Sequence, residues 1–308
     1  MMKNYQRLKG LIAATFTPMD AKGNLNLTVI DQYAELMIRS GLKGVFLCGT
    51  TGESASLTIE EQKDIASAWI KSVKGKLKVI IQVGCNAQQH AIDLAKHAYA
   101  IGADGIAATA PYFFKPRNVT ELVDFFVPIA ASAKELPFYY YNIPSMTGVY
   151  LPVPEFLTEG KRRIPNLAGV KYTHINLMEM AQCIHMDNGA FEVFNGYDEI
   201  LLPGLSLGAK AAVGSAFNYF PSVYYGIIDA FDKGDFVKAR ELQIKSIEVV
   251  NIITKHGGSV RGGKAIMNLL GIECGHCRLP LAPFSKDEYI QLKEDLDKVG
   301  FFSTVAAL

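Results

Sequence analysis

Short apolar runs alternate with longer amphipathic segments along most of the chain. Runs of three to seven residues rich in Val, Ile, Phe and Tyr predict buried strands, and apolar residues at three- and four-residue spacing predict helices. The predicted strands are 11–17, 45–48, 79–83, 105–109, 138–141, 167–171, 192–194 and 211–213. The predicted helices lie near 28–40, 58–73, 88–101, 119–134, 153–159, 176–186, 199–207 and 218–232.

Strict alternation of eight strands with eight helices implies parallel strands joined by right-handed crossovers. The count predicts a (β/α)₈ TIM barrel over residues 1–233, followed by an α-helical C-terminal extension over 234–308 with helices at 235–256 and 285–299. An open doubly wound sheet would need a glycine-rich phosphate loop after its first strand, and none is present there. Thr58 and Glu61 predict a capping box, and Gly41 and Gly102 predict helix ends.

Composition and charge exclude several classes of function. The 31 Lys and Arg against 30 Asp and Glu leave a net charge of +1, which favours neither a nucleic acid nor an anionic membrane partner. No apolar run approaches the roughly 18 residues of a membrane span. The first residues lead into a strand without a signal-peptide pattern, and the five scattered cysteines do not form a disulfide framework. We therefore expect a cytoplasmic enzyme or binding protein for a small molecule.

Polar residues gather after the predicted strands, where barrels of this kind carry their chemistry. Since the carboxyl ends of the strands share one rim, these residues predict a site: Thr50, Thr51 and Gly52 after the second strand, Tyr141 after the fifth, Lys171 and Thr173 after the sixth, Gly196, Asp198 and Glu199 after the seventh, and Ser215 after the eighth.

Lys171 is the most informative of them, because a lysine seldom ends a buried apolar strand. Desolvation disfavours the ammonium form and favours a neutral amine that can form an imine with a carbonyl substrate. An ordinary lysine that reaches water from a strand end is the alternative.

The neighbours also have two interpretations. The loop with Thr50 and Thr51 can bind a carboxylate or be a plain turn. Tyr141 can move a proton at a substrate hydroxyl, whereas the preceding tyrosines of its strand are core residues. Asp198 and Glu199 can bind sugar hydroxyls or complement a helix dipole.

Three motifs carry a family resemblance. The chain resembles the pyruvate-dependent lyases that include dihydrodipicolinate synthase and N-acetylneuraminate lyase in Gly49-Thr50-Thr51-Gly52-Glu53, Tyr141-Asn142-Ile143-Pro144 and Gly169-Val170-Lys171. Within that family, the segment Gly196-Tyr197-Asp198-Glu199 and the residue Thr173 resemble the sialic-acid-cleaving branch. Two departures count against the synthase branch: Met146 stands near the position of its carboxylate-binding arginine, and Phe113 replaces the tyrosine that it lends across a subunit interface.

The resemblance implies a class I aldolase that cleaves N-acetylneuraminate to N-acetylmannosamine and pyruvate. Lys171 would form the imine, Thr50 and Thr51 would hold the carboxylate, and Tyr141 would take the C4 hydroxyl proton, directly or through Thr50 or the substrate carboxylate. Thr173, Gly196, Asp198, Glu199 and Ser215 would orient the sugar tail. The resemblance further implies a homotetramer and no metal or organic cofactor. The alternatives are an aldolase for another 2-keto sugar acid, a synthase-like condensation, and a non-catalytic keto-acid-binding barrel.

Two further motifs resemble functional sites. Cys274 and Cys277 form a Cys-x-x-Cys motif, but a loop follows it, and one nearby histidine leaves a zinc site incomplete. The segment 258–264 nearly matches a phosphate-binding loop, but Ala265 replaces the magnesium-binding Ser or Thr and no strand precedes it. We expect neither redox activity nor nucleotide binding.

Overall fold

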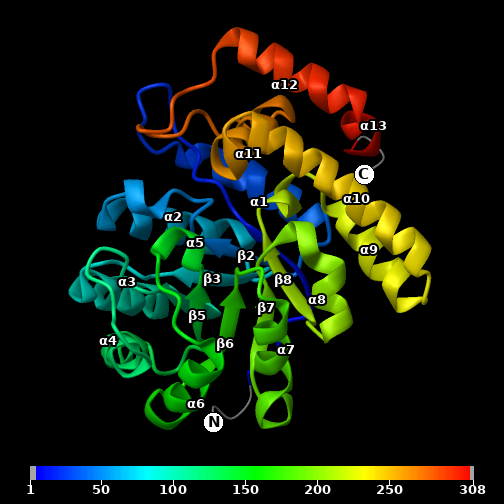
Figure 1. Ribbon diagram of the computed structural model, residues 1–308. Helices are drawn as coiled ribbons and strands as arrows, with labels where there is room; N and C mark the ends of the chain where they lie inside the picture. Colours follow the sequence, from blue (N-terminus) through cyan, green and yellow to red (C-terminus); the bar gives the residue numbers. More distant parts are fainter. Residues whose placement is uncertain (1–4, 306–308) are drawn as a thin grey trace.

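The protein is a closed barrel of eight parallel strands in sequence order, surrounded by helices (Figure 1). The computed structural model describes residues 5–305. The strands are β1 Gly10–Ala14, β2 Gly44–Leu47, β3 Lys78–Gln82, β4 Gly105–Thr109, β5 Phe138–Asn142, β6 Leu167–Tyr172, β7 Glu192–Asn195 and β8 Ala211–Gly214. The (β/α)₈ fold predicted from the alternation of apolar runs is confirmed.

The helices that follow the strands cover the outside of the barrel. They are α1 Ile30–Arg39, α2 Ile59–Val73, α3 Gln88–Ala100, α4 Val119–Ala131, α6 Val153–Arg163, α7 Leu177–His185, α8 Leu201–Leu207 and α9 Pro221–Asp232. Thr58 and Glu61 form the expected capping box at the start of α2. Gly41 and Gly102 follow α1 and α3 with positive φ angles, as their predicted role at helix ends requires.

Alternation along the strands divides the buried side chains into two layers. Residues such as Ile12, Phe46 and Tyr139 fill the barrel interior. Their neighbours on the same strands, such as Leu11 and Val45, pack with the helices in the larger core. This period of two is what a parallel sheet with both faces covered demands.

Strand β6 departs from this regular alternation. Its pairing with β5 shifts by one residue, so that Phe138 lies opposite Leu167 but Tyr139 lies opposite Gly169. The extra residue, Ala168, also belongs to the barrel interior. From Gly169 onward the strand is again regular, with Lys171 opposite Tyr141. This β-bulge therefore determines which face of the sheet Lys171 occupies.

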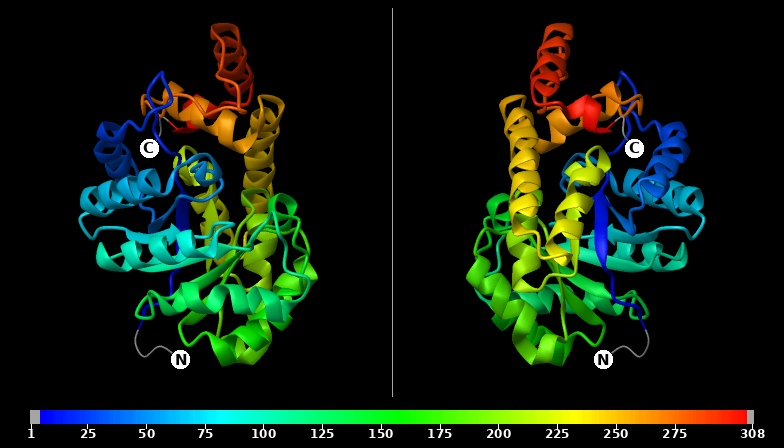
Figure 2. Two further views of the ribbon diagram at one scale, coloured as in Figure 1. Left: turned by 90° about the vertical axis from the view of Figure 1, so that its left-hand side faces the viewer. Right: turned by 90° about the vertical axis from the view of Figure 1, so that its right-hand side faces the viewer.

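The C-terminal extension comprises α10 Phe236–Lys255, α11 Gly258–Leu269, α12 Lys286–Lys298 and α13 Phe301–Val305. Helix α10 rises beside the barrel, and α11 and α12 lie beyond the end toward which the strand arrows point (Figures 1 and 2). Within the described residues, no helix is long and apolar enough to cross a membrane.

Three helices were not expected: the short α5 (Pro144–Thr147), α11 and α13. Helix α11 escaped detection because glycine is a poor helix former. Its glycines serve close packing, since a Cβ on Gly262 or Gly263 would lie 2.9 Å from Ile253 and 2.6 Å from Phe16.

The first strand is shorter than predicted and ends at Ala14. Beyond it the chain leaves the sheet to contact the extension, and the amide of Met19 donates a hydrogen bond to the carbonyl of Cys274 at 3.0 Å.

Candidate active site

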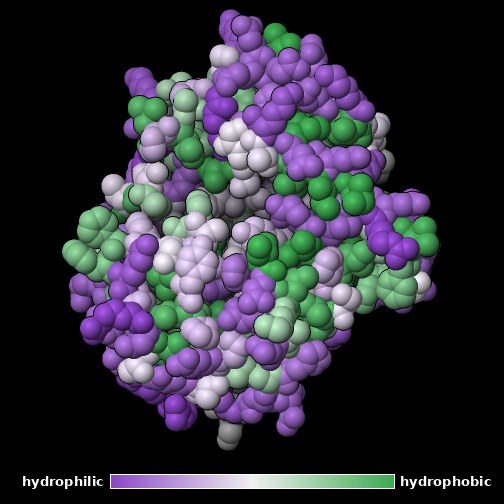
Figure 3. Space-filling model, viewed as in Figure 1, coloured by the Kyte–Doolittle hydropathy of each residue, from purple (hydrophilic) through white to green (hydrophobic). Residues whose placement is uncertain are grey.

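A cavity of about 250 Å³ opens at the carboxyl ends of the strands. Figure 3 shows the corresponding face, hollowed near its centre beneath α11. Nine of the ten predicted site residues line this cavity: Thr50, Thr51, Tyr141, Lys171, Thr173, Gly196, Asp198, Glu199 and Ser215. The tenth, Gly52, does not line it. Its carbonyl accepts a hydrogen bond from Thr17 Oγ1 at 2.7 Å, which anchors the loop from behind.

Lys171 is enclosed by aromatic rings. Its side chain comes from β6, and the residue is 3 % exposed. Nζ lies 3.9 Å from the centre of the Tyr141 ring and 4.2 Å from that of Phe46. Among residues 5–305, no carboxylate forms an ion pair with it. Burial lowers the pKa of Lys171 to about 7, against the opposing effect of the negative charge on Asp198. The amine is therefore substantially neutral, and nucleophilic, near neutral pH.

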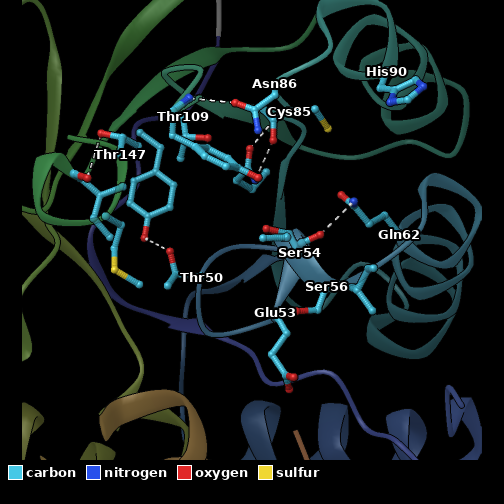
Figure 4. Close-up of a pocket in the computed structure, with 18 of the residues that line it drawn as sticks. Thr50, Glu53, Ser54, Ser56, Gln62, Cys85, Asn86, His90, Thr109 and Thr147 are labelled. Atoms are coloured by element: carbon cyan, nitrogen blue, oxygen red, sulfur yellow. Dashed lines mark hydrogen bonds between the residues drawn. The ribbon is translucent and has the colours of Figure 1, made fainter. Parts of the chain in front are cut away.

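Tyr141 places its hydroxyl beside the loop after β2. The Tyr141 hydroxyl lies 3.1 Å from Thr50 Oγ1, and either atom can donate (Figure 4). Burial raises the pKa of Tyr141 to about 12, with the hydrogen bond to Thr50 acting in the opposite direction. The phenol is therefore protonated near neutral pH, so it can accept a proton only while it passes its own to a neighbour.

The loop after β2 is a compact turn. The amide of Glu53 donates to the Thr50 carbonyl at 3.0 Å, and the amide of Ser54 donates to the Gly49 carbonyl at 3.3 Å. These two amides are thus occupied inside the turn. The side chains of Thr50 and Thr51 remain as donors on the cavity side.

Asp198 joins two strand ends and also lines the cavity. It begins the short 3₁₀-helix Asp198–Ile200 after β7. Its Oδ2 accepts a hydrogen bond from the amide of Ala216 at 2.8 Å and one from Ser215 Oγ at 3.5 Å. Burial, and then the charge of Glu199, raises the pKa of Asp198 to about 7. A Cβ on Gly214 would lie 1.7 Å from Asp198 Oδ1, so this carboxylate needs a glycine on β8.

Thr173 and Gly196 form a second close contact between strand ends. A Cβ on Gly196 would lie 2.1 Å from Thr173 Oγ1. Within the described residues that buried hydroxyl has no hydrogen-bond partner. A buried polar group without a partner is costly, so the hydroxyl is suited to a ligand that enters the cavity.

Sequence reasoning missed part of the cavity wall. Met146 lies in α5, Val250, Ile253 and Thr254 lie in α10, and Ser259 lies in α11. The extension was expected only to pack on the barrel, yet it lines the cavity. The apolar spacing of Val250 and Ile253 could have indicated a buried helix face, but not a face directed at a ligand.

A second cavity, of about 510 Å³, adjoins the first on the side of β2 to β5 and shares Thr50 and Tyr141 with it. Figure 4 shows Asn86 beside this space, where its Oδ1 accepts hydrogen bonds from the amides of Tyr112 (2.9 Å) and Phe113 (3.1 Å). The side chain of Phe113 is 75 % exposed.

The two motifs set aside in the sequence have structural roles. Cys274 and Cys277 are both buried and unpaired, and burial raises the pKa of each thiol to about 12. Thiols of this kind are protonated and poorly reactive near neutral pH. The segment 258–264 forms the first half of α11, and Lys264 is held in a buried ion pair with Glu53.

Comparison with protein families gives one assignment for nearly the whole chain. Residues 7–299 match the model of the dihydrodipicolinate synthetase family. The chain is 42% identical over 298 residues to the N-acetylneuraminate lyase of Gallus gallus, covering 96% of this chain and 97% of that protein.

Solved structures agree with the sequence relatives. The N-acetylneuraminate lyase (sialic acid aldolase) of Aliivibrio salmonicida is 38% identical, with a TM-score of 0.93 over 96% of this chain and 98% of that chain. The N-acetylneuraminate lyase of Proteus mirabilis is 34% identical, with a TM-score of 0.93 over 96% of this chain and 100% of that chain.

Proposed function

The chain belongs to the dihydrodipicolinate synthetase family, and on this premise we propose that it is a Schiff-base-forming lyase, a class I aldolase that cleaves N-acetylneuraminate to N-acetylmannosamine and pyruvate. One observation carries the proposal: a buried lysine that pairs with no carboxylate in the described part of the chain lies in the same cavity as a tyrosine, two threonines and a carboxylate suited to a polyhydroxylated keto acid. The reaction needs no metal or organic cofactor, because the imine itself accepts the electron pair.

Imine formation is the first step. The neutral amine of Lys171 adds to the C2 carbonyl, and loss of water leaves a protonated imine. The electron pair of the C3–C4 bond then moves toward the imine nitrogen as the bond breaks, which a ketone would support poorly. The lowered pKa of Lys171 supplies the free amine that this step requires.

Thr50 and Thr51 hold the substrate carboxylate. Both line the cavity beside Lys171, and Thr50 already contacts the Tyr141 hydroxyl. A carboxylate held at one end fixes C2 for attack, which lowers the entropy cost of the reaction. Gly52 anchors this loop from behind through its contact with Thr17.

Tyr141 transfers the proton of the C4 hydroxyl. With a pKa of about 12 the phenol starts protonated, so it serves as a relay. It accepts the C4 proton while it donates its own to the substrate carboxylate, either directly or through the Thr50 hydroxyl, which then passes its own proton on to that carboxylate. The 3.1 Å separation from Thr50 Oγ1 suits such a transfer.

The sugar tail extends along the ends of β6 to β8. The polar residues available there are Thr173, Gly196, Asp198, Glu199 and Ser215. Carboxylates and hydroxyls bind the hydroxyl groups of a sugar chain. The unpartnered hydroxyl of Thr173 supports this placement.

Two residues disfavour a synthase-like condensation. Met146, an apolar residue, lines the cavity near the position of the carboxylate-binding arginine of that branch. Phe113 has no hydroxyl to contribute to a neighbouring site. An aldolase for another 2-keto sugar acid differs from our proposal only in the length and acyl group of its substrate. A non-catalytic binder would need neither an unpaired buried lysine nor a proton relay.

The assembly and location remain part of the proposal. We propose a homotetramer, as the family resemblance implies, and the exposed aromatic side chains of Tyr112, Phe113 and Phe114 offer a surface for subunit contact. We also propose a cytoplasmic location, with which the five unpaired cysteines agree. Residues 1–233 form the catalytic barrel and 234–308 the extension, which adds one wall to the site.

Release of pyruvate from N-acetylneuraminate tests the function. We expect the purified protein to release pyruvate and N-acetylmannosamine in equal amounts, and borohydride with pyruvate to form a permanent adduct on Lys171. An adduct without cleavage of N-acetylneuraminate would move the substrate to another 2-keto acid. Absence of an adduct from folded protein would contradict the lyase mechanism.

A further inference from the structure

A buried ion pair connects the loop after β2 to the C-terminal extension. Glu53 Oε1 and Lys264 Nζ are 2.8 Å apart, and their side chains are 2 % and 1 % exposed. The two residues are separated by 211 positions in the sequence. Neither lines the cavity that contains Lys171. Figure 4 shows the Glu53 side chain directed away from Ser54, Asn86 and His90.

Both carboxylate oxygens of Glu53 and two of the three N–H groups of Lys264 are in use. Glu53 Oε2 accepts a hydrogen bond from the amide of Arg278 at 2.9 Å. Lys264 Nζ donates to the carbonyl of His276 at 2.7 Å. The pair thus holds the loop, α11 and the segment 276–278 together. Removing two charges from water costs several kcal/mol for each ion, so a buried pair contributes little net stability. We therefore look for the role of the pair in the geometry of the loop after β2.

The backbone of Glu53 also needs support. Its φ angle is +57°, in the left-handed region that residues with a Cβ rarely adopt. A residue with a Cβ adopts this conformation only at an energetic cost. The conformation closes the turn, because the amide of Glu53 donates to the carbonyl of Thr50. The ion pair therefore fixes the side chain of Glu53, and the backbone of the same residue completes the turn that carries Thr50 and Thr51.

The turn bears directly on the proton relay. Thr50 Oγ1 lies 3.1 Å from the hydroxyl of Tyr141, which belongs to the separate strand β5. A shift of the loop by about 1 Å would break this contact, and misplacements of that size can cost about 100-fold in rate. Lys171 lies on β6, outside this loop, so we expect its own position not to depend on the pair.

We propose that Glu53 and Lys264 are positioning residues that hold Thr50 and Thr51 in register with Tyr141. This inference rests on the proposed aldolase function. Neither residue lines the cavity that contains Lys171, although Glu53 borders the larger adjoining cavity, and the pair acts through the backbone turn from Gly49 to Glu53. It also ties that turn to α11, the helix that contributes Ser259 to the opposite wall of the cavity.

The test compares Lys264→Met with the double variant Glu53→Met/Lys264→Met. The single variant leaves a buried carboxylate without its partner, whereas the double variant removes both charges. We therefore expect the double variant to recover much of the melting temperature lost by the single variant. We expect kcat to remain about 10- to 100-fold below that of the wild type in both, because neither restores the anchor. Recovery of kcat together with the melting temperature would overturn the proposal.

Borohydride trapping with pyruvate separates positioning from loss of the nucleophile. In both variants we expect full trapping of Lys171 at saturating pyruvate, with a several-fold higher pyruvate concentration for half-maximal trapping, since Thr50 and Thr51 are displaced. Trapping does not depend on the identity of the sugar product. If the wild type is trapped with pyruvate but does not cleave N-acetylneuraminate, the proposed substrate is contradicted. If the pyruvate concentration for half-maximal trapping is the same in the variants as in the wild type, the positioning role is contradicted.

Asp295→Asn is the matched control. Asp295 is also a mostly buried carboxylate, and it joins the end of α10 to α12 through Lys255 at 2.7 Å and His256 at 3.0 Å, and none of these three residues lines the cavity. All measurements are made at a temperature where circular dichroism shows each variant folded. We expect the control to lose melting temperature while keeping kcat within twofold of the wild type. A loss of kcat in Asp295→Asn equal to that in Lys264→Met would overturn the proposal.

Discussion

Two lysines among residues 5–305 are almost fully buried, and their surroundings differ. Lys264 is paired with Glu53 and donates to a backbone carbonyl, so its charge is compensated. Lys171 lies between the rings of Phe46 and Tyr141, and no carboxylate among residues 5–305 forms an ion pair with it. Burial is common to both residues, so burial alone does not make a nucleophile. Lys171 is nucleophilic because no negative partner stabilises its ammonium form, so burial shifts the balance toward the neutral amine.

Replacing each lysine in turn with methionine should give the largest difference between the two sites. Lys171→Met should reduce kcat by about 1,000-fold or more, because no imine can form. Its melting temperature should not fall, because an uncompensated buried amine is replaced by an apolar chain of similar size. Lys264→Met should lose less activity but more stability, since an unpaired buried charge costs about 3–5 kcal/mol. Steady-state kinetics and thermal denaturation of both variants check this crossing pattern, and a Lys171→Met protein with wild-type activity would refute it.

The substitution Tyr141→Phe separates proton transfer from imine formation at Lys171. The substitution keeps the ring that lies 3.9 Å from Nζ and removes only the hydroxyl. We expect kcat for cleavage to fall about 100-fold, the lower range for loss of a general acid–base group. Trapping by pyruvate and borohydride should persist, since the amine keeps its surroundings. Parallel loss of trapping and cleavage would assign Tyr141 to imine formation rather than to the proton relay.

The pH dependence of imine formation tests the electrostatic half of the argument. Because the pKa of Lys171 is lowered to about 7, the neutral fraction is one half near pH 7. Below that value it falls about tenfold per pH unit, and above pH 8 it is nearly constant. The initial rate of adduct formation with cyanoborohydride and fixed pyruvate, from pH 5.5 to 9, measures this curve. A midpoint near 10 would mean that Lys171 behaves as an ordinary exposed lysine.

Asp198→Ala should have the smallest effect. The negative charge of Asp198 raises the pKa of Lys171, so its removal should shift the midpoint of adduct formation to lower pH. The KM for the sugar acid should rise about tenfold, as expected for lost hydrogen bonds to a charged group, while half-saturation by pyruvate changes little. Equal changes for both ligands would show that Asp198 does not contact the tail.

The sequence predicted the barrel because its periodicity is regular. Each apolar run corresponds to a strand, and the Thr58 capping box marks the start of α2. The extension was harder to predict, since α11 contains glycines whose purpose is close packing against Ile253 and Phe16. Local propensity argues against a helix there, and tertiary contacts decide otherwise.

The sequence predicted those residues of the candidate site that lie at or shortly after the ends of strands. Lys171, Tyr141 and Asp198 come directly after apolar runs, so topology alone brings them to one rim. Met146, Val250 and Ser259 carry no comparable signal, because an apolar or small residue on a helix is usually core or surface. The pairing of Glu53 with Lys264 spans most of the chain, and no local pattern indicates such a contact.

The direction of the nucleophile depends on how many residues β6 contains. Leu167 faces the helices, and strict alternation from it would place Lys171, four positions later, on the same outer face. The bulge inserts Ala168 beside Gly169 on the inner face, and the parity changes before the lysine is reached. Gly169 permits this, since a Cβ there would lie 1.8 Å from the carbonyl oxygen of Glu192. One more residue inserted between the bulge and Lys171 would direct the amine outward, toward the helices, with every side chain unchanged. Catalysis therefore depends on whether the number of residues before Lys171 in β6 is odd or even, as well as on the chemistry of the side chain.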